Sequence, residues 1–108
     1  MKTQKQMLAK KYINNFCDVL NKINFDDVSK LKHAISKSIK EKKNIYICGN
    51  GGSAAISNHF HCDFLNQVSR RSKIKPQIYS LVSNIEIFIE VANDYKYEDV
   101  FYYQCKNY

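Results

Sequence analysis

The stretch Ile45-Tyr46-Ile47-Cys48-Gly49-Asn50-Gly51-Gly52-Ser53-Ala54-Ala55 decides how this chain of 108 residues folds. A short apolar run leads into glycines and then into small helix-forming residues, which predicts a buried strand, a tight turn and a helix start. The first amide N–H groups of a helix have no partner within the helix, and at such a turn they point toward one spot. This arrangement favours an anion, so we expect a phosphate-bearing ligand at the turn.

The elements around this stretch predict an α/β fold. Helical spacing of apolar residues, short apolar runs and Pro76 give the following sequence of elements: helices over residues 3–23 and 26–42, a strand over 44–48, a helix over 53–68, a basic loop over 69–76, a strand over 77–82, a helix over 85–92, a break at Asn93–Asp94 and a helix over 97–106. Two strands separated by a helix are expected to be parallel, which predicts a three-layer sheet fold. Two strands do not complete such a sheet, so we expect the chain to be truncated or to share its sheet with another chain.

We divide the chain into a helical segment over residues 1–42 and an α/β segment over 43–108. The first helix carries a broad apolar stripe that includes Leu8, Tyr12 and Phe16. A helix with such a face must pack against a core or another subunit.

Composition excludes several classes of protein. The formal charge is +7, with 15 Lys/Arg against 5 Asp/Glu in residues 1–75 and 2 against 5 in residues 76–108. Only Arg70 and Arg71 are arginine, and the basic residues are not interleaved with aromatic ones, so nucleic-acid binding is disfavoured. No apolar run is long enough for a membrane span or a signal peptide. Four irregularly spaced cysteines fit reduced thiols in the cytoplasm.

The glycine-rich turn has more than one interpretation. Residues 49–54 fit the dinucleotide pattern G-x-G-x-x-A, but the second strand ends in Val82-Ser83-Asn84 without the carboxylate that would bind a ribose. A P-loop is disfavoured even more, because no Gly-Lys-Ser/Thr follows. The glycines could also serve only a tight strand–helix turn. The side chains of Asn50 and Ser53, which add polar groups to the backbone ones, favour a binding site.

Two polar pairs could contribute to a site near this turn. His59 and Asp63 are four residues apart and share a helix face, as a metal-binding or proton-transfer pair would, although an ordinary surface pair is the more common case for this spacing. His61 is expected on the surface and Cys62 in the core. Asn93–Asp94 is expected to interrupt a helix near the carboxyl ends of the strands, where open α/β sheets bind ligands. Taken alone, however, it is an ordinary helix end.

Together these motifs resemble the sugar-isomerase (SIS) domain of the phosphoheptose isomerase family. The resemblance rests on the block Cys48 to Ala55, on His59-Phe60, on Ala92-Asn93-Asp94-Tyr95 and on Tyr97-Glu98-Asp99-Val100-Phe101. It runs from about Lys43 to the last residue, and the two N-terminal helices fit the helical entry of that family.

The resemblance implies a site and an activity. Members of the family isomerise sedoheptulose 7-phosphate for surface polysaccharide synthesis. The residues implied to bind this substrate are Asn50, Gly51, Gly52, Ser53, Asp63, Asn93 and Asp94. His59 matches a zinc ligand. Asp63 stands where the family has a glutamate that is both a ligand and the acid/base catalyst, and its shorter side chain puts both roles in question.

The same resemblance implies a homotetramer that contains the N-terminal helices in its core. The second phosphate loop and the remaining Gln and His ligands of the family are not encoded in these 108 residues. We therefore expect a phosphosugar isomerase that has little or no activity as this chain. The alternative is a non-catalytic SIS module that binds a phosphosugar or a protein partner.

Overall fold

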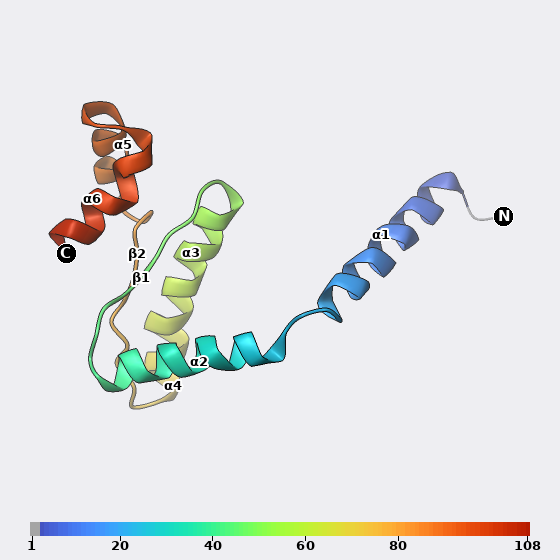
Figure 1. Cartoon of the computed structure of the whole chain (residues 1–108), viewed down its shortest axis with the longest axis horizontal. Coiled ribbons are helices and arrows are strands. Elements are labelled where there is room, and N and C mark those ends of the chain that lie inside the picture. The colour runs from blue at the N-terminus through green and yellow to red at the C-terminus, as the bar shows by residue number, and fades with distance from the viewer. Residues whose placement is uncertain (1–2) are drawn as a thin grey trace. The chain divides into compact units, whose positions relative to one another are not determined.

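The computed structural model describes residues 3–108, which form mostly helices and a small parallel sheet (Figure 1). Its elements, in chain order, are α1 (Gln4–Leu20), α2 (Phe25–Lys40), β1 (Ile45–Ile47), α3 (Gly52–Cys62), the π-helical segment η1 (Asp63–Val68), α4 (Ser69–Arg71), β2 (Ile78–Ser80), α5 (Ile85–Asp94), the 3₁₀ segment η2 (Tyr97–Asp99) and α6 (Val100–Asn107). The predicted α/β fold with two N-terminal helices is confirmed.

The chain divides into two compact units between His33 and Ala34, within α2. In the first unit, the N–H of Thr3 donates to Oε1 of Gln6 at 2.9 Å, which fixes the start of α1. Asn24 accepts from the N–H of Asp26 at 2.9 Å and precedes the first residue of α2. Neither helix has a buried residue.

The second unit is built on two parallel strands. Ile45 pairs with Ile78, and Ile47 pairs with Ser80. The helical stretch from α3 to α4 connects the strands, and Figure 1 shows α3 running alongside them. This is the crossover that the order of elements predicts. Short apolar strands flanked by helices therefore fix the position of the turn that follows β1.

The core of the second unit lies at the end of β2 and under the last two helices. Its buried apolar residues are Ile78, Leu81, Val91 and Val100. Gln104, only 3% exposed, donates to the carbonyl oxygens of Leu81 and Val100 at 2.9 and 3.0 Å. A buried amide needs such partners, and these bonds fasten α6 to the end of β2.

The structure corrects the predicted limits of two helices. Ser69–Arg71 continue the helix as α4, so the basic loop is shorter than expected and begins after Arg71. Asn93 and Asp94 are not a break, because α5 includes both and its C-cap is Tyr95. In each case the helix continues until the backbone turns extended or irregular, and the polar residues near its end did not show where that happens.

A lysine in a left-handed conformation ends α2. Lys42 has φ 54°, its N–H donates to the carbonyl of Ile39, and the N–H of Lys43 donates to the carbonyl of Ser38. This pair of bonds is the Schellman motif, in which glycine usually takes the left-handed position. The motif turns the chain sharply from α2 into β1.

Candidate functional site

The turn after β1 needs glycine at two of its three glycine positions. A Cβ on Gly49 would lie 2.6 Å from the backbone carbon and oxygen of Ser53, so no side chain fits there. Gly51 has φ 54° and ψ −123°, a conformation that side-chain-bearing residues avoid. Gly52 has neither constraint: its φ is not in the left-handed region, and a Cβ there would meet nothing within 4 Å. The fold itself therefore does not require glycine at position 52.

The helix after the turn starts one residue earlier than Ser53. Gly51 is the N-cap and Gly52 the first residue of α3, so Ser53 lies in the first turn of the helix. The N–H groups of Ser53 and Ala54 donate to the carbonyls of Asn50 and Gly51 at 3.0 and 3.1 Å. Within residues 3–108, this leaves the N–H groups of Gly51 and Gly52 without a backbone acceptor. These two amides, at a helix N-terminus, remain for an anion.

Asn50 is held by a residue distant in the sequence. The hydroxyl of Tyr97 donates to Oδ1 of Asn50 at 2.9 Å and ties η2 to the glycine turn. The amide nitrogen of Asn50 keeps its two hydrogen-bond donors. Tyr97 belongs to a block that carries the family resemblance, but no role was predicted for its hydroxyl, because a contact between residues so far apart leaves no local pattern.

Asn93 and Asp94 lie in the last turn of α5, and both are exposed. In the described part of the chain, no hydrogen bond joins either residue to the glycine turn. The link between that turn and this region is the bond from Tyr97. The structure therefore leaves the roles of Asn93 and Asp94 as predictions.

His59 and Asp63 share one helix face, as their spacing predicts. Nε2 of His59 lies 3.5 Å from Oδ2 of Asp63, and the two side chains are 77% and 52% exposed. They line a hollow of about 470 Å³ together with Ala55, Ile56 and Phe60. His59 follows Gly52 by seven residues, which is about 10 Å along the helix axis. A ligand held at the turn and in this hollow would have to be several bonds long, as a sugar phosphate is.

These two side chains do not complete a metal site. Among residues 3–108, no group of three or more His, Cys, Asp and Glu side chains is placed to hold a metal ion. A zinc site needs at least three protein ligands. The residues present supply a histidine nitrogen and a carboxylate, which are suitable donors, but too few for zinc. No catalytic step through a metal follows from this chain.

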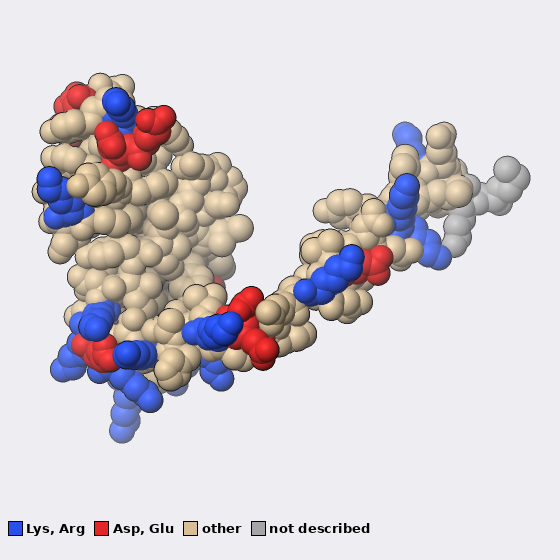
Figure 2. Space-filling view, in the orientation of Figure 1, with Lys and Arg blue, Asp and Glu red and all other residues tan. Residues whose placement is uncertain are grey.

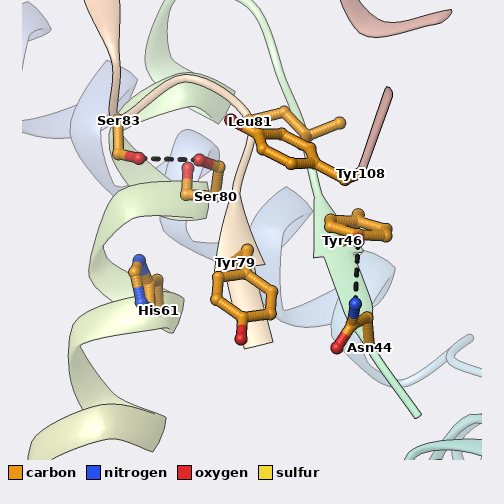
Figure 3. A pocket seen from close by; sticks show the side chains of 8 residues that line it. All are labelled: Asn44, Tyr46, His61, Tyr79, Ser80, Leu81, Ser83 and Tyr108. Atoms are coloured by element: carbon orange, nitrogen blue, oxygen red, sulfur yellow. Dashed lines mark hydrogen bonds between the residues drawn. The ribbon is translucent and has the colours of Figure 1, made fainter. Parts of the chain in front are cut away.

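A further hollow, of about 310 Å³, lies beside the two strands and is shown in Figure 3. It is lined by residues from four segments of the chain: Asn44, Tyr46, His61, Tyr79, Ser80, Leu81, Ser83 and Tyr108. The rings of Tyr46 and Tyr108 are stacked with centroids 5.8 Å apart, and Tyr79 lies between Tyr46 and His61. Aromatic faces and hydroxyl groups of this kind suit a small polar ligand.

Sequence reasoning missed this hollow and assigned two of its neighbours wrongly. His61 is half-buried against Tyr79, whereas Cys62 is exposed, the reverse of the expectation. The reason is the buried face of α3, which carries the small residue Ser57 instead of a large apolar one. Ile56 is 69% exposed, so apolar character does not mark the inner face of this helix.

Comparisons with known proteins agree with the fold and the turn. The sequence profile described as "SIS domain" matches residues 11–106. Phosphoheptose isomerase of Halorhodospira halophila is 36% identical over 84 residues, which are 78% of this chain and 41% of that protein. Phosphoheptose isomerase of Thermodesulfovibrio yellowstonii is 34% identical over 83 residues, 77% of this chain and 41% of that protein. Probable phosphoheptose isomerase of Thermoplasma acidophilum is 31% identical over 95 residues, 88% of this chain and 52% of that protein.

The chain thus spans about two fifths to one half of the length of these curated relatives. The family profile covers the glycine turn, the His59–Asp63 pair and η2, the parts of the structure that carry its polar groups. The chain belongs to the SIS domain family and is similar in sequence to phosphoheptose isomerases.

Proposed function

We propose that this chain forms one wall of the substrate site of a phosphosugar isomerase of the sedoheptulose 7-phosphate isomerase type. The observation that carries the proposal is Gly52, whose lack of a side chain the fold does not require. A ligand that approaches the backbone closely would require it, because a Cβ would occupy the ligand's place. The similarity to phosphoheptose isomerases supports a sugar phosphate as this ligand.

The parts of the wall have distinct roles in this proposal. The N–H groups of Gly51 and Gly52 bind substrate oxygens that carry negative charge. The amide of Asn50 and the hydroxyl of Ser53 donate to sugar hydroxyls, and Asn93 and Asp94 bind the sugar from the end of α5.

Asp63 is the proposed acid/base. Interconversion of a ketose and an aldose passes through an enediol: a proton leaves the carbon beside the carbonyl and is returned to the former carbonyl carbon, while the hydroxyl proton of the first carbon passes to the former carbonyl oxygen. The carboxylate of Asp63 would carry the carbon-bound proton. His59, 3.5 Å away, orients that carboxylate. In a complete enzyme the same two side chains would be two of the zinc ligands.

The test compares glycine variants for binding of sedoheptulose 7-phosphate, measured by isothermal titration and by chemical-shift changes. Gly52→Ala is expected to keep the fold, because its Cβ meets nothing within 4 Å, and to weaken binding at least tenfold. Ser53→Ala is expected to weaken binding less, since it removes one hydrogen bond. Ser36→Ala, an exposed serine in α2, is the matched control. Unchanged binding by Gly52→Ala would overturn the proposal.

A non-catalytic SIS module is the second candidate, and the incomplete ligand set of the described residues favours it. The two functions differ in what His59 does. In a binding module, His59→Ala leaves the affinity for sedoheptulose 7-phosphate unchanged, and zinc changes neither protein. In the isomerase, His59 orients the carboxylate of Asp63 against the sugar, so His59→Ala weakens this affinity.

A further inference from the structure

A groove with a basic rim lies at the end of the sheet opposite to the glycine turn. It has a volume of about 650 Å³ and is lined, from α2 and from the loop before β2, by Ser36, Ile39, Lys40, Lys42, Lys73, Ile74 and Lys75. We call these seven residues the basic groove. Figure 2 shows lysine and arginine side chains gathered around the end of α2 and the loop after α4.

The lysines of the basic groove have no acidic partner in the described chain. Glu41 is the nearest acidic residue in sequence, and its carboxylate pairs with Lys43 at 2.6 Å and with Lys37 at 3.9 Å, both outside the groove. No ion pair within residues 3–108 involves any of the four groove lysines. Ile74, on the floor, is 45% exposed. The groove therefore offers four unneutralised positive charges around an apolar floor.

The outer face of α5 has the opposite character. Ile85 and Ile89 are 54% and 52% exposed and lie one helical turn apart. Glu86 and Glu90, which directly follow these two isoleucines in the sequence, are also exposed. The inner face packs into the protein through Val91, which is buried. We call Ile85, Glu86, Ile89 and Glu90 the acidic face, and Figure 2 shows acidic side chains gathered in this region.

One chain cannot join its own groove to its own acidic face. Lys73, Ile74 and Lys75 precede β2, whereas α5 follows it, so the two surfaces lie at opposite ends of the same strand. The charge of the chain is divided in the same way: residues 1–75 hold ten more basic than acidic residues, and residues 76–108 hold three more acidic than basic ones. Contact between the two surfaces requires two copies.

We propose that the acidic face of α5 in one copy docks into the basic groove of a second copy. The isoleucines of α5 cover Ile39 and Ile74, and the two glutamates lie among the groove lysines. Exposed apolar side chains at the centre and opposite charges around them are the features that bring two protein surfaces together in one register. A nucleic acid is disfavoured as the occupant because the groove contains no aromatic side chain or arginine for its bases.

The experiment uses a carbodiimide, which joins an amine directly to a carboxylate only when the two already touch. The chain is prepared in unlabelled and ¹⁵N-labelled forms, mixed in equal amounts, cross-linked and digested for mass spectrometry. The expected products join Glu86 or Glu90 to a groove lysine and contain one labelled and one unlabelled peptide. Their yield is expected to fall severalfold between 0.1 and 1 M salt, where the screening length shortens from about 10 to about 3 Å.

Two charge-reversal variants sharpen the test. Lys73→Glu with Lys75→Glu reverses the groove, and its remaining Lys40 and Lys42 are expected to cross-link to α5 at least tenfold less. Glu86→Lys with Glu90→Lys reverses α5. When the two variants are mixed, Glu86 and Glu90 of the first should join Lys73 and Lys75 of the second, a product that no single chain can form.

The matched control is Lys5→Glu with Lys10→Glu on α1, which changes the same number of charges and should leave these products at their original yield. The recovery of cross-links in the mixture also shows that both reversal variants are folded. The proposal is overturned if mixed-isotope products between α5 and the groove are absent, if they are no more abundant than links to Lys5 and Lys10, or if mixing the variants restores nothing.

Discussion

At Gly49 and Gly52, two glycines three residues apart have different physical reasons to be glycine. The backbone of Ser53 leaves no room for a side chain at position 49, whereas position 52 faces open space. We predict that Gly49→Ala lowers the free energy of unfolding by about 1–3 kcal/mol through overpacking. Gly52→Ala should leave it unchanged or raise it by less than about 1 kcal/mol, because alanine lowers the entropy of the unfolded chain.

Urea unfolding followed by circular dichroism measures both free energies. Equal destabilisation by the two substitutions would show that position 52 is sterically restricted after all, and would remove the structural basis for a ligand at that glycine.

Tyr95, the C-cap of α5, has an altered acidity. A side-chain hydrogen bond with Tyr103 raises the pKa of Tyr95 above 10.0, and the charges of Tyr103 and Asp94 act in the same direction. The rings lie 5.2 Å apart. Because the pKa is raised on folding, the neutral phenol stabilises the fold below pH 10, and this contribution disappears as the pH rises through the folded-state pKa.

We predict that Tyr103→Phe returns the pKa of Tyr95 toward 10. Titration of the Tyr95 ring by NMR, with Tyr102→Phe as the neighbouring control, measures the change. A pKa that does not move in Tyr103→Phe contradicts the assignment of the hydrogen bond.

Among the elements, α1 carries a broad apolar face that no other part of the described structure buries. Tyr12 and Phe16 are 73% and 54% exposed, and Leu20 is 44% exposed. An apolar stripe of this size on a helix is typical of an interface between chains. We therefore keep the homotetramer of the family resemblance as a proposal, with α1 as its contact.

We predict that Phe16→Glu with Leu20→Glu lowers the molecular mass measured by sedimentation, because two charges would have to be buried in the interface. Lys10→Glu with Lys11→Glu also places two glutamates on α1, but at positions that are already charged and not apolar. This control is expected to leave the mass unchanged. A variant with glutamate at both apolar positions that keeps the mass of the original chain would assign the interface elsewhere.

Sequence patterns predicted these elements where the cause is local. Apolar periodicity located α2, and the apolar run followed by glycines located β1 and the turn. The ends of α4 and α5 were misplaced because serines and asparagines near a helix end are compatible with either continuation or termination. The orientation of α3 was also missed: its buried side is set by packing against β2 through Ser57 and by the bond from Ser80 to Asn58, and neither shows as an apolar pattern.

For the molecule as a whole, the described residues form only part of a catalytic site, and this leads to a prediction about activity. The described residues supply two possible metal ligands, His59 and Asp63, and one wall of a pocket. Positioning and charge stabilisation by a complete site supply most of an enzyme's rate enhancement. We therefore predict that the 108-residue chain binds sedoheptulose 7-phosphate but turns it over at least a thousand times more slowly than its longer relatives. A coupled assay with the Halorhodospira halophila enzyme as the positive control measures this, and comparable turnover contradicts the prediction.

Contacts between segments distant in the sequence are the part of the candidate site that could not be predicted. The pairing of His59 with Asp63 follows from helix geometry and was predicted. The placement of His61 against Tyr79 and the bond from Tyr97 to Asn50 depend on how distant segments meet, and no periodicity encodes them.

Within residues 3–108, no helix is both long and apolar enough to cross a membrane.

The bond from Tyr97 to Asn50 also has a consequence for the order of events during synthesis. The two residues are 47 positions apart, so a ribosome adding about 5–20 residues per second exposes the glycine turn several seconds before its partner. β1 has no strand to pair with until β2 (Ile78–Ser80) has emerged, and Asn50 has no tyrosine hydroxyl to orient it until Tyr97 follows. The nascent turn therefore acquires its final geometry only when η2 leaves the exit tunnel, and the edge of β1 is a target for chaperones in the earlier interval before β2 emerges.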